Sequence, residues 1–385
     1  MEAFGGQFSQ TSVVPRLGAV NQGLEAFMCD SLRSTRDGRP GVVSPRCRFD
    51  IAILIVGFRN SEDILTCLAA LSRMECEAAF DVFICENGGR EAYRELVERL
   101  NCPSCLLAEC DPADGRVDRA ASFMEVRRLQ FKNRASNVWV GCAEENLGYA
   151  GGINAWLKPL TLIAGWKGIW ILNPDAEPRP NALAALIERA EKGRKAMVGS
   201  TILESGSEDL IRFRGGLHWQ TLAARGTAVG LHDRIGDPFD LFAIEEGLDA
   251  PSGASTYATR QCVEQIGFME DSYFLFFEDL EWGARAKKLG LGYASDSIVA
   301  HRGGTTTGSS GTLRGLSKLS VYLEHRNAIH FVRKHRPWTL PIRIVLSLLY
   351  ALRFLMHGAP RNSVATLEGL FAGLCGETGR PAWHR

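Results

Sequence analysis

The 385-residue chain lacks a net charge, because 44 Lys and Arg residues balance 44 Asp and Glu residues. A neutral chain lacks the basic excess with which nucleic-acid-binding proteins neutralise phosphates, so we expect no nucleic-acid partner. The sequence also lacks visible internal repeats, and 45% of its residues are hydrophobic. This composition excludes disordered and fibrous proteins and indicates a globular protein of two or three domains.

The sequence also lacks features of secreted and membrane-spanning proteins. No basic segment followed by an apolar core opens the chain, as a signal peptide would. Charged residues interrupt the apolar stretches before they reach about 20 residues, the length of a membrane span. The eleven cysteines are an odd number, and Cys67, Cys85 and Cys142 lie in apolar runs, as buried thiols do. We therefore expect a protein of the reducing cytoplasm.

A complete zinc motif is also absent. Cys102 and Cys105 have the spacing of zinc ligands, and Cys110 lies nearby. No second such pair, of cysteine or histidine, follows to complete four ligands. Free thiols are the favoured interpretation.

The neutral total conceals an uneven distribution of charge. From Arg314 to the C-terminus, eleven basic residues stand against three acidic ones, a net charge of +8, which leaves −8 for residues 1–313. Within this basic region, Leu340–Met356 is apolar except for Arg343 and Arg353. We expect a helix that lies on the anionic inner face of the plasma membrane, or one that packs on the rest of the chain or in a homodimer contact.

Short apolar runs alternate with helical patterns in the first half of the chain. Such runs are typical of strands buried on both faces, as in a parallel sheet covered by helices. Their order predicts an α/β protein with a doubly wound sheet. The predicted strands are Ile51–Val56, Asp81–Cys85, Asn137–Cys142 and Trp170–Leu172.

The remaining segments are assigned from helical spacing and turn residues. The stretch between Cys102 and Asn137 shows no clear pattern, and short strands with Gly-rich turns predict a mixed sheet in the second half, from Ser200 to Asp249. We expect residues 1–48 to be a loosely ordered extension. The predicted helices follow a cap at Asn60 or Ser61, span Arg90–Leu100, run from Gly148 to Pro159, and span Pro180–Lys192 with Gly193 beyond the end.

Polar or Gly-rich segments follow all four predicted strands. Because the carboxyl ends of parallel strands meet at one edge of a sheet, a ligand site is expected there. Each segment alone is a common turn sequence, but four at one edge favour a binding site. They are Gly57–Asn60, Glu86–Gly88, Asn146–Asn154 and Asn173–Asp175.

A further segment delivers two adjacent carboxylates to the start of a helix. The aromatic run Ser272–Phe277 precedes Glu278 and Asp279, and the helical pattern ends at Gly290. Two compatible roles are open for Asp279: the N-cap of the helix, and a general base that the helix dipole keeps ionised. His301 ends an apolar run, where a lone histidine is more often structural than a ligand.

Seven blocks in a fixed order resemble the family 2 glycosyltransferases, particularly their rhamnosyltransferase-like and galactofuranosyltransferase-like branch. The resemblance covers roughly residues 49–335. It implies a GT-A fold, a nucleotide-binding Rossmann-like sheet flanked by helices, for residues 49–313. The charge pattern and the apolar segment described above make residues 314–385 a separate basic helical region. The blocks are Ile51–Asn60, Glu86–Gly88, Asn146–Asn154, Leu172–Asp175, Asp249–Gly253, Phe277–Asp279 and His301.

The resemblance also implies a reaction. A sugar, rhamnose or a similar one, would pass with inversion from a dTDP- or UDP-linked donor to a hydroxyl of a glycan or lipid-linked oligosaccharide in cell-surface polysaccharide synthesis. Asp279 matches the family's general base. Asp175 and His301 match ligands of a divalent metal, Mn²⁺ or Mg²⁺, and the imidazole favours Mn²⁺. Asn173 replaces the first acid of the family's metal motif, which implies weaker metal binding.

Other positions match donor and acceptor sites. Glu86 stands where the family usually has Asp for the nucleobase or ribose. Trp282 has two open roles, stacking on an acceptor sugar or core packing, and Arg326 either contacts the diphosphate or lies on a surface helix. Glu278 is assigned to the acceptor site with Trp282. The donor-site candidates are Phe58, Arg59, Glu86, Asn87, Gly148, Gly151, Gly152, Asn154, Asn173 and Arg326.

Two other function classes are considered. An NAD-dependent oxidoreductase would fit the alternating strands and helices, but G-F-R-N rather than G-x-G-x-x-G follows the first strand. A carbohydrate-binding or scaffolding protein with a decayed active site would fit the replacements at Asn173 and Glu86.

Overall fold

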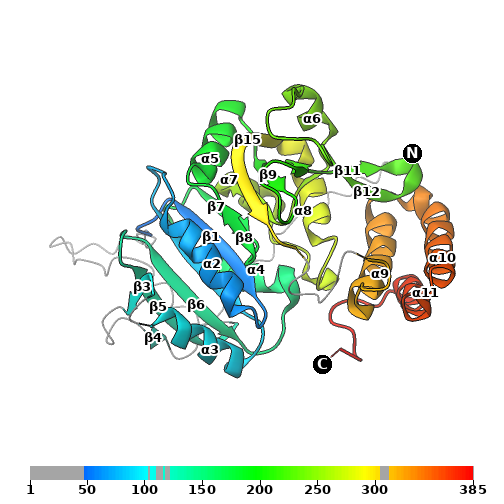
Figure 1. Ribbon diagram of the computed structural model, residues 1–385, viewed down its shortest axis with the longest axis horizontal. Coiled ribbons are helices and arrows are strands. Elements are labelled where there is room, and N and C mark those ends of the chain that lie inside the picture. The colour runs from blue at the N-terminus through cyan, green and yellow to red at the C-terminus, as the bar shows by residue number, and fades with distance from the viewer. Residues whose placement is uncertain (1–46, 103–104, 110–115, 118–121, 304–311, 385) are drawn as a thin grey trace, which may run out of the picture.

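The computed structural model describes residues 47–102, 105–109, 116–117, 122–303 and 312–384. The predicted N-terminal extension therefore lies almost wholly outside the described residues, as does Cys110. The described chain forms one large sheet with helices on both faces and a group of helices at one side (Figure 1). The predicted α/β class is confirmed.

The first half of the sheet is parallel, as predicted. Its strands lie in the order β6, β2, β1, β7, and each pairs in parallel with its neighbour. Each predicted strand is found with ends within two residues of those expected. The bounds are β1 Ile51–Gly57, β2 Phe80–Glu86, β6 Asn137–Ala143 and β7 Gly168–Leu172.

The second half of the sheet is mixed, which also confirms the prediction. Strand β14 (Ser255–Thr259) runs antiparallel between β7 and β9 (Met197–Leu203). Strand β15 (Leu291–His301) is parallel to β9, and β8 (Ala176–Pro178) pairs antiparallel with β15. The register pairs His301 with Ala176, which brings His301 beside Asp175.

The stretch without a clear sequence pattern contains β5 (Phe123–Phe131), an edge-side strand antiparallel to β6. Its charged residues, among them Arg127 and Arg128, obscure the alternation by which a half-buried strand is recognised. Two short strands, β3 (Leu107–Glu109) and β4 (Arg116–Val117), pair with β5.

Two hydrophobic cores cover the two faces of the sheet. Strand β1 contributes alternate residues to each: Ile51, Ile53 and Ile55 to one core, and Ala52, Leu54 and Val56 to the other. Helices α2, α3 and α5 contribute to the first core, and α4 contributes to the second. Their bounds are α2 Ser61–Ser72, α3 Arg90–Leu100, α4 Gly148–Leu160 and α5 Ala182–Gly193.

Two predicted helix ends are wrong in detail. Asn60 is the N-cap residue of α2, as predicted, but its side chain makes no capping hydrogen bond, because its Oδ1 accepts a hydrogen bond from the backbone N–H of Phe58 instead. Helix α5 includes Gly193, and Arg194 takes the left-handed conformation (φ 49°) that ends it. Local sequence did not reveal that an arginine rather than the glycine occupies this position.

The cysteines of the described residues are free thiols, and Cys67, Cys85 and Cys142 are buried as predicted.

The other elements are short, apart from the C-terminal helices. The short elements are β10 Ile211–Arg214, β11 Gly216–Gln220, β12 Arg225–Ala228, β13 Ala250–Pro251, α6 Leu241–Gly247, α7 Arg260–Ile266 and α8 Glu278–Ala286.

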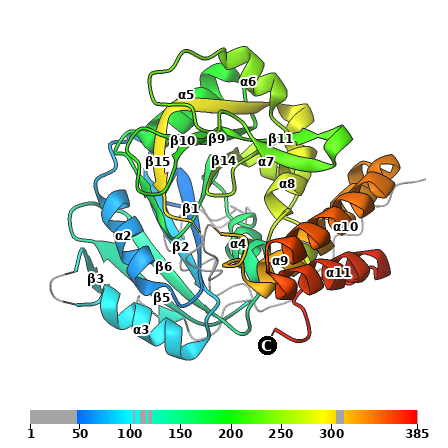
Figure 2. The same ribbon diagram turned by 45° about the vertical axis from the view of Figure 1, so that its right-hand side comes forward.

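Three helices form the C-terminal region: α9 (Lys318–His335), α10 (Leu340–Met356) and α11 (Pro360–Cys375). They pack together on one side of the sheet-bearing part (Figure 2). The helical segment Pro337–Met356 spans 20 residues with a mean hydropathy of 1.6, long and apolar enough to cross a membrane. This corrects the expectation that no segment reaches that length, although length and composition alone are weak grounds for a span.

Candidate active site

The ends of β1, β2 and the start of α4 are joined at the carboxyl edge of the sheet. The carboxylate of Glu86 accepts hydrogen bonds from the backbone N–H groups of Arg59 (3.1 Å) and Gly88 (2.7 Å). The side chain of Asn87 donates to the carbonyl of Gly148 (2.8 Å). The polar segments predicted to meet at this edge are therefore together in space.

Glu86 has a clear role in organising this edge. It is only 1% exposed, and burial raises the pKa of its carboxyl group despite the two backbone hydrogen bonds. Phe58 and Arg59, by contrast, lie partly or fully exposed after β1. Donor contacts by these residues stay a prediction.

The Gly-rich segment serves packing in this structure. A Cβ on Gly152 would lie 2.8 Å from the side chain of Val56, and one on Gly151 would lie 2.9 Å from Leu147. At Gly148 (φ 72°), a Cβ would lie 2.2 Å from the carbonyl oxygen of Phe274. Gly152 and Gly148 therefore allow the close approach of α4 to β1 and to the loop at Phe274, and Gly151 avoids a clash with Leu147, the residue before the helix.

Two donor-site expectations at α4 meet contrary contacts. The N–H of Gly148 donates to Asn146 Oδ1 (3.0 Å), and the N–H of Tyr149 donates to the carbonyl of Phe274 (2.7 Å), so neither amide is left for a phosphate. Asn154 is buried, and its amide both donates to and accepts from the backbone of Met269. Asn154 therefore anchors that loop rather than facing a ligand.

Asp175, His301 and Asn173 form one cluster. His301 Nε2 lies 3.1 Å from Asp175 Oδ1 and 3.0 Å from the side-chain nitrogen of Asn173. The second oxygen of Asp175 accepts a hydrogen bond from the N–H of Gly303 (2.8 Å). Burial opposes ionisation of Asp175, but the hydrogen bond and electrostatic attraction of His301, together with the backbone N–H groups of Gly303 and Asp175, outweigh it and lower the pKa of the carboxyl group. The predicted metal-site residues therefore converge.

The donor atoms of this cluster fit a divalent metal. A carboxylate, an imidazole and an amide oxygen are a set suited to Mn²⁺, and Nδ1 of His301 is buried without a partner among the described residues. Across the described part of the chain, no group of three or more His, Cys, Asp and Glu residues is placed to hold a metal. The protein thus offers two strong ligands and an amide rather than a closed cage.

Tyr149 connects this cluster to the segment that carries Asp279. Its hydroxyl lies 2.9 Å from Asn173 Oδ1 and 2.8 Å from the carbonyl oxygen of Gly253. The N–H of Gly253 in turn donates to Asp279 Oδ2 (3.2 Å). Sequence reasoning did not select Tyr149 or Gly253 as site residues, although both lie within the blocks that carry the family resemblance.

The structure corrects one proposed role of Asp279. Helix α8 begins at Glu278, and its N-cap is Phe277. Asp279 accepts a hydrogen bond from the N–H of the next residue, Leu280 (2.7 Å), within the first turn. Asp279 is therefore not the N-cap, and its half-buried carboxylate is held by Gly253 and Leu280.

Glu278 and Asp279 form a coupled carboxyl pair. Burial, followed by the adjacent charge of Asp279, raises the pKa of Glu278 to about 8. Burial also raises the pKa of Asp279, against the two backbone N–H groups that favour its charged form. Glu278 Oε2 has no hydrogen-bond partner among the described residues, so we assign the proton at neutral pH to Glu278 and the charge to Asp279.

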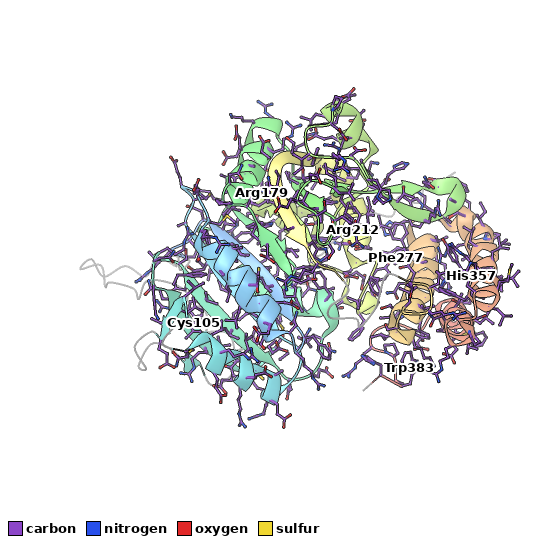
Figure 3. The ribbon with its side chains drawn as sticks, viewed as in Figure 1. Cys105, Arg179, Arg212, Phe277, His357 and Trp383 are labelled. Carbon is purple, nitrogen blue, oxygen red and sulfur yellow. The ribbon has the colours of Figure 1, made fainter. Side chains whose placement is uncertain are left out.

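The loop before this pair has an unfavourable backbone conformation. Phe274, Phe276 and Phe277 have φ angles of 67°, 68° and 72°, in the left-handed region that costs bulky residues about 1–2 kcal/mol each. The side-chain amide of Asn327 donates to three carbonyls of this loop, at 2.8–2.9 Å. Figure 3 shows Phe277 between the sheet-bearing part and the C-terminal helices.

Arg326 belongs to the same support and not to a diphosphate site. It is fully buried, and its guanidinium donates to the carbonyls of Tyr273 (3.0 Å) and Gly379 (2.7 Å) and to the Asn327 side chain (3.0 Å). Both open roles for Arg326, diphosphate contact and surface helix, are therefore wrong. Sequence alone could not show that α9 is buried at these positions.

Trp282 and Glu278 also lie inside the protein. Trp282 is 1% exposed, and its indole N–H donates to the carbonyl of Gly267 (3.0 Å), which leaves no ring face for an acceptor sugar. Of its two open roles, core packing is the one observed. Glu278 is 4% exposed, so direct acceptor binding by its side chain is not supported.

Comparison with known proteins adds a sequence relationship. No family model matches the chain. An N-acetylglucosaminyl-diphospho-decaprenol L-rhamnosyltransferase of Mycobacterium tuberculosis, found in two strains, is 24% identical over 275 residues, 65% of this chain and 81% of that protein. The predicted resemblance to rhamnosyltransferases is confirmed. The enzyme class of this relative, a glycosyltransferase, is the one that the motifs predict.

Solved structures of other glycosyltransferases align at low sequence identity. TarS 1–349 of S. aureus in complex with UDP-GlcNAc is 12% identical, covers 85% of this chain and 92% of that one, and has a TM-score of 0.43. The mannosyltransferase PcManGT of Pyrobaculum calidifontis, in complex with GDP-Man and Mn²⁺, is 12% identical with a TM-score of 0.43, covering 88% and 92%. The chain spans 43% of a longer TarS structure.

Replacing Glu278 by Gln should remove a pH dependence of stability. The raised pKa means that folding takes up a proton, so the stabilisation is present below about pH 4.5 and is lost as pH rises toward about 8. In that window the wild type should lose about 1.4 kcal/mol of unfolding free energy per pH unit from this group. Urea unfolding from pH 5 to 8.5 measures it, with Glu246→Gln, an exposed change on α6, as the control. Parallel profiles for wild type and E278Q would contradict the pKa assignment.

Replacing Asn327 by Ala should weaken the loop that carries the carboxyl pair. Three loop carbonyls lose their donor, so we expect a loss of about 2–4 kcal/mol in unfolding free energy and a lower turnover number. The matched control is Asn362→Ala, whose buried amide donates to the carbonyls of Leu313 and Leu316 away from this loop. N362A should lose stability and keep its turnover; unchanged turnover in N327A would contradict the positioning role.

Proposed function

We propose that the protein is an inverting glycosyltransferase that moves a sugar from a nucleotide diphosphate to an acceptor hydroxyl. The observation that carries this proposal is a continuous path of contacts. It joins the Asp175–His301 pair to Asp279 through Asn173, Tyr149 and Gly253. A site for an anionic leaving group and a site for a general base are thereby held at a set spacing, as a displacement with inversion requires.

Asp279 acts as the general base in this proposal. Its Oδ2 is held by the N–H of Gly253, and the neutral Glu278 beside it leaves one negative charge on the pair. That charge takes the proton from the attacking acceptor hydroxyl, on the face of the sugar opposite the departing diphosphate. Residues 49–313 form the catalytic domain, and the segment 314–385 supports it through α9.

Asp175 and His301 would hold the divalent metal, with Asn173 as a weaker oxygen ligand. When bound, Mn²⁺ or Mg²⁺ supplies positive charge that neutralises the departing nucleoside diphosphate. The protein itself orients these ligands: the N–H of Gly303 holds Asp175, and the hydroxyl of Tyr149 holds Asn173. The nucleotide would bind at the carboxyl edge of the sheet, beside Phe58, Arg59, Glu86 and Asn87.

The substrates are proposed by analogy with the similar proteins. The M. tuberculosis relative is named for L-rhamnosyl transfer to a lipid-linked N-acetylglucosaminyl diphosphate, so we propose a dTDP- or UDP-linked deoxyhexose or hexose donor and a lipid-linked acceptor. For this chain we propose a cytoplasmic location, peripheral to the inner face of the plasma membrane, where the lipid of such an acceptor would be anchored.

Replacing Asp279 by Asn tests the base. Asn cannot take a proton, so transfer should fall by about 100-fold or more while donor binding is retained. Turnover is measured by release of the nucleoside diphosphate across a panel of sugar donors with a lipid-linked acceptor, and donor binding by calorimetry. Full turnover by D279N would refute the assignment.

The position of the Asp279 carboxylate can be tested separately. A Cβ on Gly253 would lie 2.9 Å from Asp279 Oδ2, so Gly253→Ala should displace the carboxylate and lower turnover about tenfold or more. The control is Gly247→Ala, where a Cβ meets no atom within 4 Å. Equal turnover in both variants would count against the proposed geometry.

Replacing Asp175 by Asn tests the metal site without a catalytic readout. Wild-type protein with UDP should gain thermal stability on addition of Mn²⁺, since ligand binding to the folded state raises the melting temperature, and EDTA should reverse the gain. D175N should lose most of this response. Asp296→Asn, an exposed change on the same strand as His301, should keep it. A full Mn²⁺ response in D175N would place the metal elsewhere.

A further inference from the structure

Helices α10 and α11 carry a large apolar surface that the rest of the described chain leaves uncovered. Of the nineteen large apolar side chains exposed in the described residues, eleven lie between Trp338 and Leu374, so this exposure is concentrated in one region. On α10 they are Val345, Leu348, Leu349, Leu352, Leu355 and Met356, which follow Trp338, and on α11 they are Val364, Leu367, Phe371 and Leu374. We name this set the apolar face.

The apolar face belongs to helices with inverted polarity. Helix α10 buries the polar side chains of Arg343 and Ser347 together with Ala351 and Phe354, and it exposes four of its six leucines, Leu348, Leu349, Leu352 and Leu355. The buried guanidinium of Arg343 lies 3.1 Å from His325 Nδ1, and the hydroxyl of Ser347 lies 3.0 Å from the same nitrogen. A surface helix of a water-soluble protein has the opposite arrangement, with its apolar side inward.

Helix α11 shows the same inversion with small residues. A Cβ on Gly369 would lie 2.3 Å from the carbonyl oxygen of Tyr322, and one on Gly373 would lie 2.8 Å from that of Arg326. Small residues four apart let helices approach closely, which is how helices pack when the hydrophobic effect does not drive their large side chains inward. Four large side chains of α11, those of Val364, Leu367, Phe371 and Leu374, are exposed, whereas Leu370 is buried.

The charges around the apolar face are almost all positive. From Arg336 to Gly376 the only acidic residue is Glu368, which is paired with Lys318 at 2.8 Å. The exposed side chains of Arg353 and Arg361 have no ion-pair partner among the residues that the structure describes. Figure 3 shows His357, in the turn between these two helices, at the outer edge of the molecule.

We propose that the apolar face lies in the interface of an anionic lipid bilayer. Its leucines and Phe371 enter the acyl region, and Arg353 and Arg361 contact lipid phosphates. Charge selects this occupant over a second copy of the chain. Two copies of the same face would bring unpaired guanidinium groups together without acidic partners, whereas phosphates neutralise them. Arg343, buried in the protein, keeps α10 along the surface rather than across the bilayer.

The test uses the full chain and two kinds of vesicle. Wild-type protein should sediment with vesicles of phosphatidylcholine and phosphatidylglycerol, and much less with phosphatidylcholine alone or at high salt. The triple variant Leu349→Gln, Leu352→Gln, Phe371→Gln should bind the anionic vesicles at least about tenfold more weakly, because three apolar side chains that enter the bilayer are lost. Its melting temperature should match that of the wild type, since all three side chains are exposed.

A matched control changes three exposed apolar side chains elsewhere: Leu162→Gln, Leu231→Gln and Phe242→Gln, which should bind like the wild type. Equal vesicle binding by both triple variants would overturn the proposal. The proposal would also be overturned if the wild type formed a dimer that did not bind vesicles and if the apolar-face variant were a monomer. In that case a second copy of the chain would cover the apolar face. D279N should bind vesicles normally, so failure of the proposed reaction and failure of the membrane proposal are distinguishable.

Discussion

The amide of Asn327 is the contact on which the position of the carboxyl pair depends. Three aromatic residues, Phe274, Phe276 and Phe277, hold left-handed backbone angles that they would leave if unsupported. The donors of Asn327 and Arg326 satisfy the carbonyls that this conformation turns toward α9. The C-terminal region is therefore part of the machinery around the site and not a detachable tail. Buried Glu281 of α8 adds to this connection, because its carboxylate pairs with Lys334 of α9 as well as with Arg285 of its own helix.

Burial gives the two adjacent carboxyl groups, Glu278 and Asp279, different protonation states. In water both would be ionised at neutral pH, whereas inside the protein the unsolvated Glu278 holds a proton and the N–H groups at Asp279 favour charge there. Asp175 is buried as well, yet the imidazole of His301 lowers its pKa. The same edge of the sheet thus contains a neutral and an ionised carboxyl group side by side, and an ionised one beside a histidine.

The proposed membrane contact of the C-terminal helices would explain why the basic residues of a neutral chain are concentrated at its C-terminal end. Their basic residues surround leucines that face outward, while Arg343 and Ser347 are buried. In the proposed arrangement the loop at Phe274–Phe277, which α9 supports, lies near the apolar face that contacts the membrane. An acceptor attached to a lipid would then meet the general base without leaving the bilayer surface, a consequence that rests on the proposed reaction.

The sequence by itself determined the buried parallel strands, the mixed second half and the helical C-terminal region. These depend on short apolar runs and on turn residues at strand ends, which local sequence contains. The pairing of Asp175 with His301 came from the resemblance to a known family and not from a local pattern. Strand β5 was not predicted, because its charged residues, which are tolerated near the edge of the sheet, obscure the alternation of apolar and polar residues. Tertiary structure alone decided that Asn154, Trp282 and Arg326 are buried supports, that Phe277 rather than Asp279 caps α8, and that Tyr149 and Asn327 tie distant segments together. Asn154, Tyr149, Arg326 and Asn327 each have a hydrogen-bond partner that lies 50 to more than 100 residues away, and the burial of Trp282 depends on which face of its helix is covered, so no local pattern carries that information.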